Sequence, residues 1–384
     1  MVVKCLRHPG EKSHANQARR CHGTAALSFI ATLVLLLIPE YSAEAQFPGI
    51  EMTWRSGEPT HDLTGLSLEE LSQLDIVQLN VLGGHTHPAG QIMFGYTYMH
   101  MHMSGLYQGT REISPAEAFA EGFSTVHTEM EMDMHMFDAM YAPTDRLTLM
   151  AMLPYKTESM LHLRNDNTRF TQSADGIGDL EVMALYTVLG DIHKGGHRLV
   201  VNAGISFPTG SINVRDHDGG DPSRPLVLLE YPMQFGSGTY DLMPGLTYLG
   251  DTGRWSWGAQ TIETVRFGRN YHGYRFGNRY RVSAWGAYGI TDWFAPSLRL
   301  LGDWWEDVQG SDPGLASNHT PEGRPNLRGG RRIDLLFGTN FYVPRGPLKG
   351  TRLMLEGGIP IYQNLDGPQL GTAWILSVGC TYAF

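Results

Sequence analysis

The chain has 384 residues, of which 42% are hydrophobic, and its formal net charge at pH 7 is -10. An acidic surplus repels phosphate backbones, so nucleic acid is excluded as an expected partner. Three cysteines are too few for a disulfide framework.

Residues 1–45 have the composition of a secretory signal peptide. Arg19-Arg20 precedes an apolar run, Ala25–Ile38, and Ala43-Glu44-Ala45 has the small-residue pattern of a cleavage site. We therefore expect export and a mature chain that begins near Gln46. This segment contains five basic and three acidic residues. The mature chain therefore has 24 basic and 36 acidic residues, and its formal net charge is -12.

Residues 46–89 form a distinct N-terminal segment in the prediction. Ser67 can cap a short helix, because two glutamates follow in its first turn and Leu68, Leu71 and Leu74 share one face. The stretch Leu66-Ser-Leu-Glu-Glu-Leu71 resembles one that precedes the barrel in some TonB-dependent receptors. Two interpretations stay open: a plug inside a barrel, or a periplasmic docking segment.

From residue 90 to residue 384, hydrophobicity alternates with the period of two that is typical of β-strands. The predicted strands are 91–104, 126–140, 146–155, 180–189, 197–207, 240–248, 255–267, 279–290, 293–305, 332–343, 351–362 and 372–384. The connections alternate between short turns and long loops, the latter at 105–125, 156–179, 208–239, 268–278, 306–331 and 363–371. An even strand number with loops sorted by length predicts an all-β fold, a transmembrane antiparallel β-barrel of about twelve strands.

The two ends of the chain point to the outer membrane of a Gram-negative bacterium. Ser377–Phe384 ends in an aromatic residue and resembles the C-terminal insertion signal of bacterial outer-membrane barrels. This resemblance implies the barrel-assembly machinery as a partner, with outer-membrane lipid around the finished wall. Aromatic residues near both predicted rims support this location, because aromatic rings prefer membrane interfaces.

The first two predicted strands alternate methionine with histidine and acidic residues. A charged side chain that faces lipid at mid-membrane costs roughly 2–4 kcal/mol. We therefore expect the alternate positions that carry histidine and acidic residues to face the lumen, and the methionine positions to face lipid. A hairpin centred near residue 115 would place His100 opposite Glu129 or Glu131. The candidate metal ligands in this upper lumen are His100, His102, His127, Glu129, Glu131, Asp133 and His135, with His85 and His87 added if the N-terminal segment folds inward.

Two interpretations of these ligands remain. Imidazole and carboxylate suit divalent copper, zinc, nickel or iron, while a polar network could simply fill a narrow barrel. The predicted channel requires no cofactor, and the first interpretation adds a bound divalent transition metal. Copper binding by methionine is disfavoured, because the same parity points the thioethers outward.

Later strands contribute further inward charges by the same parity argument. The expected lumen-lining residues are Glu181, Arg198, Asp241, Arg281, Arg299, Asp303, Arg332, Asp334, Arg352 and Glu356. Their arginines would lie opposite the acid-rich wall of the first two strands. The result is either a transverse field that orients small solutes or a set of ion pairs that closes the lumen.

Three later stretches carry a family resemblance. They are Asp175-Gly-Ile-Gly-Asp-Leu-Glu-Val182, Phe207-Pro-Thr-Gly-Ser211 and Gly236-Ser-Gly-Thr-Tyr-Asp-Leu-Met-Pro-Gly-Leu-Thr-Tyr248. Together they resemble the MetA-pathway phenol-degradation family of outer-membrane, transporter-like barrels over about residues 90–384, with the histidine- and methionine-rich strands as a subgroup feature. This resemblance implies a channel-like barrel and uptake of small organic compounds.

The sequence therefore favours an outer-membrane channel or transporter, porin-like in build, that passes a small solute. A transition-metal-binding barrel for copper or zinc is the first alternative. An outer-membrane lipase is the second, but the chain lacks a G-x-S-x-G motif. We expect no enzymatic activity.

Overall fold

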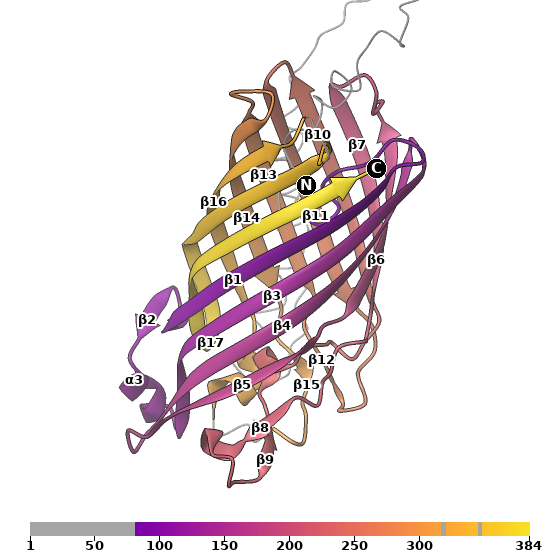
Figure 1. The fold of residues 1–384 in the computed structure, drawn as a ribbon. Helices are drawn as coiled ribbons and strands as arrows, with labels where there is room; N and C mark the ends of the chain where they lie inside the picture. Colours follow the sequence, from indigo (N-terminus) through magenta and orange to yellow (C-terminus); the bar gives the residue numbers. More distant parts are fainter. Residues whose placement is uncertain (1–80, 316–319, 345–347) are drawn as a thin grey trace, which may run out of the picture. The chain divides into compact units, whose positions relative to one another are not determined.

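The alternating segments form long antiparallel strands in the computed structural model of the chain (Figure 1). The structure describes residues 81–315, 320–344 and 348–384. The expected signal peptide and the expected helix after Ser67 lie outside these described residues.

Eleven labelled strands follow one another around the wall, each paired with the next. They are β1 (Ile92–Gly109), β3 (Thr125–Thr144), β4 (Leu147–Arg164), β6 (Leu180–Leu189), β7 (His197–Phe207), β10 (Asp241–Thr252), β11 (Trp255–Arg266), β13 (Arg279–Tyr288), β14 (Phe294–Trp305), β16 (Gly330–Tyr342) and β17 (Thr351–Ala383).

The last strand, β17, crosses the wall twice. It pairs with β16 from Arg352 to Leu365, and then with β1 from Leu365 to Ala383. Both pairings are antiparallel, so the strand doubles back near Leu365 and closes the sheet into a barrel. The expectation of about twelve crossings is confirmed.

Several strands are longer than their hydrophobic pattern predicts. Strand β4 continues to Arg164, where β5 (Arg169–Ile177) pairs with its outer part, and β1 is followed by the short β2 (Arg111–Ile113). The prediction of long loops at 105–125, 156–179 and 363–371 was therefore wrong in extent. A strand can continue beyond an apolar band with polar residues on both faces, so the hydrophobic alternation ends before the strand does.

The remaining long connections build small elements at one end of the barrel, the outer end (Figure 1). They carry α3 (Pro115–Ala120), β8 (Arg215–His217), β9 (Leu226–Leu228), β12 (Tyr274–Arg275), β15 (Gln309–Gly310) and the 3-10 turns η3 (Asp218–Gly220), η4 (Tyr231–Met233), η5 (Pro321–Gly323) and η6 (Pro325–Leu327). Ser114 caps α3 through a reciprocal capping box with Glu117. In the described ranges, no helix is long and apolar enough to cross a membrane.

The outer face of the wall is apolar. Its exposed side chains include Leu149, Val182, Val201, Ile205, Leu242, Leu298, Leu300, Phe337, Leu353, Leu355, Ile359 and Ile361. Exposed rings lie near the two rims, Tyr141, Trp255, Trp293 and Phe384 at the short-turn end and Tyr155, Tyr240, Phe267 and Tyr362 at the outer end. An apolar band between aromatic girdles is the surface that lipid requires of a barrel.

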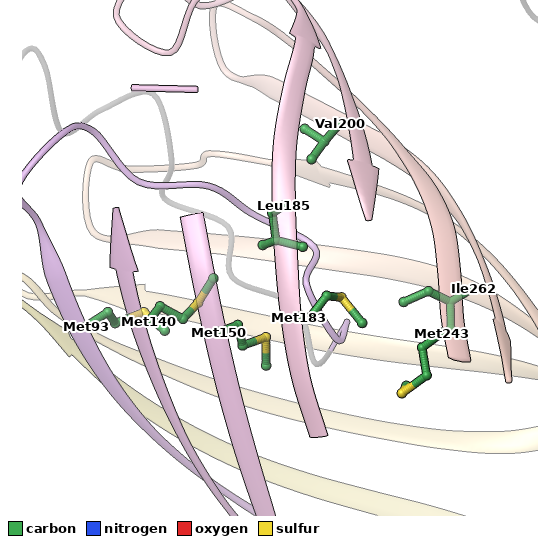
Figure 2. Close-up of a cluster of buried hydrophobic side chains, with 8 residues drawn as sticks. All are labelled: Met93, Met140, Met150, Met183, Leu185, Val200, Met243 and Ile262. Atoms are coloured by element: carbon green, nitrogen blue, oxygen red, sulfur yellow. The ribbon is translucent and has the colours of Figure 1, made fainter. Parts of the chain in front are cut away.

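A cluster of buried apolar side chains lies on the inner face (Figure 2). Figure 2 shows its members, which come from seven neighbouring strands with two on β6: Met93, Met140, Met150, Met183, Leu185, Val200, Met243 and Ile262. Leu82 from the N-terminal segment packs against this cluster. The interior is thus partly a hydrophobic core and partly a cavity.

Candidate functional site: the lumenal cavity

The barrel encloses a cavity of about 670 Å³. Val81, Leu82, Gly83 and His85 of the N-terminal segment line it near the short-turn end, and the loop segment from Tyr231 to Ser237 lines it near the outer end. Chain segments that are not strands of the wall therefore lie at both ends of the cavity.

One wall of the cavity is built of methionine. Met99, Met101 and Met103 project from β1, and Met132, Met134 and Met136 project from β3. The register places Met101 beside Met132 and Met99 beside Met134. Cross-strand neighbours of this kind lie about 4.5–5.5 Å apart between Cβ atoms, so the thioethers form a continuous strip.

Methionine is used only on the inside of the described chain. Of the 18 methionines in the sequence, Met1 and Met52 precede the described residues. The others all line the cavity or lie buried, whereas the exposed apolar residues of the outer face are leucine, isoleucine, valine and aromatic residues. The prediction that methionine faces lipid and the histidine and acid parity faces inward was wrong.

The error has a physical cause. Strands β1 and β3 are 18 and 20 residues long, which exceeds the roughly 9–11 residues that a tilted strand needs to span a membrane. The cost of a charge facing lipid does not apply to the whole of such a strand. The outward charges are also paired with one another and flanked by aromatic rings, as at a membrane interface.

The outward patch contains His100, His102, Glu129, Glu131, Asp133 and His135. His100 Nδ1 lies 2.8 Å from Asp133 Oδ1, and His102 Nδ1 lies 2.6 Å from Glu131 Oε1. The register pairs His100 with Asp133, not with Glu129 or Glu131 as expected. The ring of Trp374 lies 4.9 Å from that of His100 and 5.9 Å from that of His102, measured between centroids. Within this patch, the ligand atoms of His102, Glu129 and Glu131 are close enough to share an ion.

His127 does not belong to this patch. It is fully buried at the outer end of β3, in contact with His162, Glu230 and Glu322. His162 was missed because its strand was predicted to end at residue 155, and the two glutamates because no local pattern marks them. His85 lines the cavity, whereas His87 is buried and its backbone N–H donates to Thr148 Oγ1 at 3.1 Å.

The inward position of the methionines and the outward position of His100 can be tested by fluorescence quenching. In a Cys380→Ser background, we expect a bimane fluorophore at Met101→Cys to be protected from brominated lipids, because the side chain points into the lumen. The same label at His100→Cys should be quenched, because that side chain points outward. Equal quenching at both positions would contradict the assignment.

The wall opposite the methionine strip is charged. Of the ten residues expected there, the cavity is lined by Glu181, Asp241, Arg281, Arg299, Asp303, Arg332 and Arg352. Asp334 and Glu356 are buried beside it, where they pair with Arg332 and Arg299 respectively, and Arg198 is buried elsewhere in the wall. Arg279 and Arg266, which the sequence analysis did not single out, pair with Asp303 and Asp241.

The expected transverse field does not form in the predicted way, because the facing wall is mostly thioether, with Asp138 and Lys156 as its charged side chains. Most of the lumenal arginines instead have acidic partners. Arg281 also lines the cavity; it makes no hydrogen bond or salt bridge to another described residue, and Asp303, its cross-strand neighbour, and Glu181 attract it electrostatically. The cavity therefore combines an apolar, polarisable side with a side that offers a guanidinium group.

The N-terminal segment is fixed inside the wall by its backbone. Gln260 Nε2 donates to the carbonyl oxygen of Leu82 at 2.9 Å, and Asn202 Nδ2 donates to that of Gly83 at 3.4 Å. Residues 81–83 thus lie inside the wall and line the cavity.

The three family-like motifs meet at the β5–β6 junction. Asp179 accepts hydrogen bonds from the backbone N–H groups of Gly210 at 2.9 Å and Ser237 at 2.7 Å. A Cβ atom on Gly210 would lie 2.7 Å from the Cα atom of Gly236, so this close backbone approach requires glycine. These glycines therefore hold loops together and need no chemical role.

Comparison with known proteins identifies the fold. No protein-family model and no curated protein sequence matches the chain. The crystal structure of an outer membrane channel from Pseudomonas putida F1 matches with a TM-score of 0.56 and 14% identity, over 80% of this chain and 100% of that one. A FadL homologue from Pseudomonas aeruginosa matches less well, with a TM-score of 0.40 and 10% identity over 76% and 90% of the two chains. The chain thus has the fold of outer-membrane β-barrels.

Proposed function

We propose that the protein is an outer-membrane channel that passes a small organic solute with an apolar body and an anionic group. The observation that carries this proposal is the two-sided cavity, with a methionine strip on β1 and β3 facing an arginine-bearing wall. Passage requires no catalytic group. The proposal includes membership of the phenol-degradation family of transporter-like barrels, which the three motifs support.

The two walls suit the two parts of such a solute. Thioethers are flexible and polarisable, and they make favourable contacts with aromatic rings. A guanidinium whose N–H groups make no hydrogen bond can bind a carboxylate through two parallel hydrogen bonds. Arg281 is therefore the residue that we expect to recognise the anionic group.

Conductance in planar bilayers tests this proposal, with the mature chain and benzoate as the probe. We expect benzoate to bind within the lumen and reduce the chloride current. Arg281→Gln should weaken this block roughly tenfold, because a charge-assisted hydrogen bond is worth about 1.5–3 kcal/mol. Arg111→Gln, an exposed residue of β2 that does not line the cavity, is the matched control. Equal block in wild type and the Arg281 variant would refute the assignment of Arg281, and no conductance at all would refute the channel.

One observation favours a second candidate, a path for a soft metal ion. Thioether sulfur binds soft ions such as Cu(I), and the described chain reserves methionine for its interior. Leucine keeps the volume and apolar character of methionine but lacks the sulfur. The test uses the triple variant Met99→Leu, Met101→Leu, Met132→Leu, with Ag⁺ as the probe for a soft ion. A retained benzoate block supports the organic solute. Loss of Ag⁺ binding, measured by calorimetry, supports the metal path.

A further inference from the structure

Four ionisable side chains from four separate segments meet at the outer end of the barrel. His127 lies on β3 and His162 lies directly opposite on β4. Glu230 precedes η4, and Glu322 lies in η5. The exposed fractions are 0% for His127, 1% for His162 and 2% for Glu322. Two long loops thus deliver carboxylates to a pair of imidazoles that a strand pairing already holds together.

The distances suit a shared ion. The two imidazole centroids are 4.4 Å apart, and His127 Nε2 lies 3.9 Å from Glu230 Oε1. One ligand atom from each of His127, His162 and Glu230 lies within 4.8 Å of the others. Ligands of a tetrahedral zinc ion, each at about 2.0–2.2 Å from the metal, are about 3.3–3.6 Å apart, so the three atoms must approach one another by up to about 1.5 Å. Small side-chain rotations would bring the three atoms into range.

The partners of the two rings are those that metal-bound histidines have. His162 Nδ1 lies 3.0 Å from the carbonyl oxygen of Met160, so it carries the proton and leaves Nε2 as the free ligand atom. His127 Nδ1 lies 2.9 Å from Glu322 Oε2 in a close contact without hydrogen-bond geometry, and its Nε2 lies on the side of Glu230, 3.9 Å from Oε1. A ligating histidine typically donates its other N–H to a carbonyl or a carboxylate, which fixes the ring.

The group has unmet hydrogen-bonding capacity. In the part of the chain that the structure describes, His127 Nε2, His162 Nε2 and Glu230 Oε2 are buried without a hydrogen bond of ordinary geometry. A buried polar atom left in this state costs about 1–3 kcal/mol. Two carboxylates also face one nearby guanidinium, that of Arg328. Both features call for a cation.

We propose that His127, His162 and Glu230 bind a divalent metal ion of the zinc class, with Glu322 orienting His127 as a positioning residue. Two imidazoles and one carboxylate suit Zn²⁺, and also Co²⁺, Ni²⁺ or Cu²⁺. The ion fastens the loops that carry Glu230 and Glu322 to the β3–β4 hairpin. This site is separate from the solute cavity and does not depend on the proposed function.

Metal content of the refolded mature chain tests the site. After incubation with Zn²⁺ and gel filtration, we expect one bound equivalent by mass spectrometry, and Co²⁺ in its place should give the visible absorption of a four-coordinate ion. His162→Gln and Glu230→Gln should abolish retention. Glu322→Gln should bind roughly 10–100-fold more weakly, as loss of a carboxylate that orients a ligand does.

His272→Gln is the matched control. His272 Nδ1 also pairs with a loop carboxylate, Asp312 Oδ2, at 2.9 Å, but it lies outside the group. This variant should retain the metal. The proposal is overturned if wild type retains no Zn²⁺, or if His162→Gln retains as much as the control. If a ligand variant fails to fold, the Co²⁺ spectrum of the wild-type protein decides: an octahedral spectrum, or none, refutes the site.

Discussion

Glu356→Gln is expected to destabilise the barrel by about 3–5 kcal/mol, because it leaves a buried guanidinium without its charge partner. Arg299 Nε donates to Glu356 Oε1 at 2.9 Å, and a second hydrogen bond joins Nη2 to Oε2. The side chains are 6% and 1% exposed. Urea titration of the folded protein in lipid vesicles, followed by tryptophan fluorescence, measures the change.

Two further variants separate the buried pair from a general loss of charge. Replacing both partners, Arg299→Met with Glu356→Leu, should recover most of the stability, since apolar residues of similar volume often substitute for a buried ion pair. Arg224→Gln removes a guanidinium that is 46% exposed and pairs with Asp218, so its effect should lie near the limit of detection. A Glu356→Gln variant as stable as Arg224→Gln would contradict the prediction.

Removal of the N-terminal segment through His87 should raise single-channel conductance several-fold. Residues 81–83 line the cavity, and Leu82 packs against the apolar cluster on the inner wall. Ion passage depends on the narrowest part of a pore and on the groups that line it. Planar-bilayer recordings of the shortened chain and of the chain from residue 46 make the comparison.

Gln260→Leu provides a milder form of the same experiment. It removes the hydrogen bond to the carbonyl oxygen of Leu82 while keeping a side chain of similar size. We expect more frequent openings of the wild-type size. If neither variant differs from wild type, the described part of the segment does not limit passage.

The strands could be predicted from the sequence because each crosses an apolar band. Predicted and observed bounds agree closely where a strand is short, as for 180–189, 197–207 and 255–267 against β6, β7 and β11. They diverge for β1 and β4, which continue at the outer end beyond the predicted limits of residues 104 and 155 to Gly109 and Arg164. Hydrophobic alternation reports contact with lipid and not the length of a hydrogen-bonded strand.

The candidate site was harder to predict. Alternating hydrophobicity divides the side chains of a strand between two faces, but it does not show which face points into the lumen. In β14 and β16 the charged parity was placed correctly, since Arg299 and Arg332 line the cavity. In β1 and β3 the same rule failed, because methionine is apolar enough for either face and the charged residues satisfy one another outside. Nothing local in the sequence distinguishes these cases.

The buried histidine group shows a different limit. His127 and His162 become neighbours only through the register of β3 and β4. The two glutamates come from loops whose paths depend on the folded barrel. The pattern within any single segment therefore does not show that these four residues are neighbours.

The way β17 closes the wall bears on how the barrel forms. Met93 pairs with Ala383, so the seam joins nearly the first described strand residue to the last. Contacts this distant in sequence form slowly, because a long stretch of chain must be ordered before they are made. Until then β1 has an unpaired edge, and such edges template aggregation. Because the segment after Leu365 supplies the partner of β1, a chain truncated before this segment cannot complete its sheet.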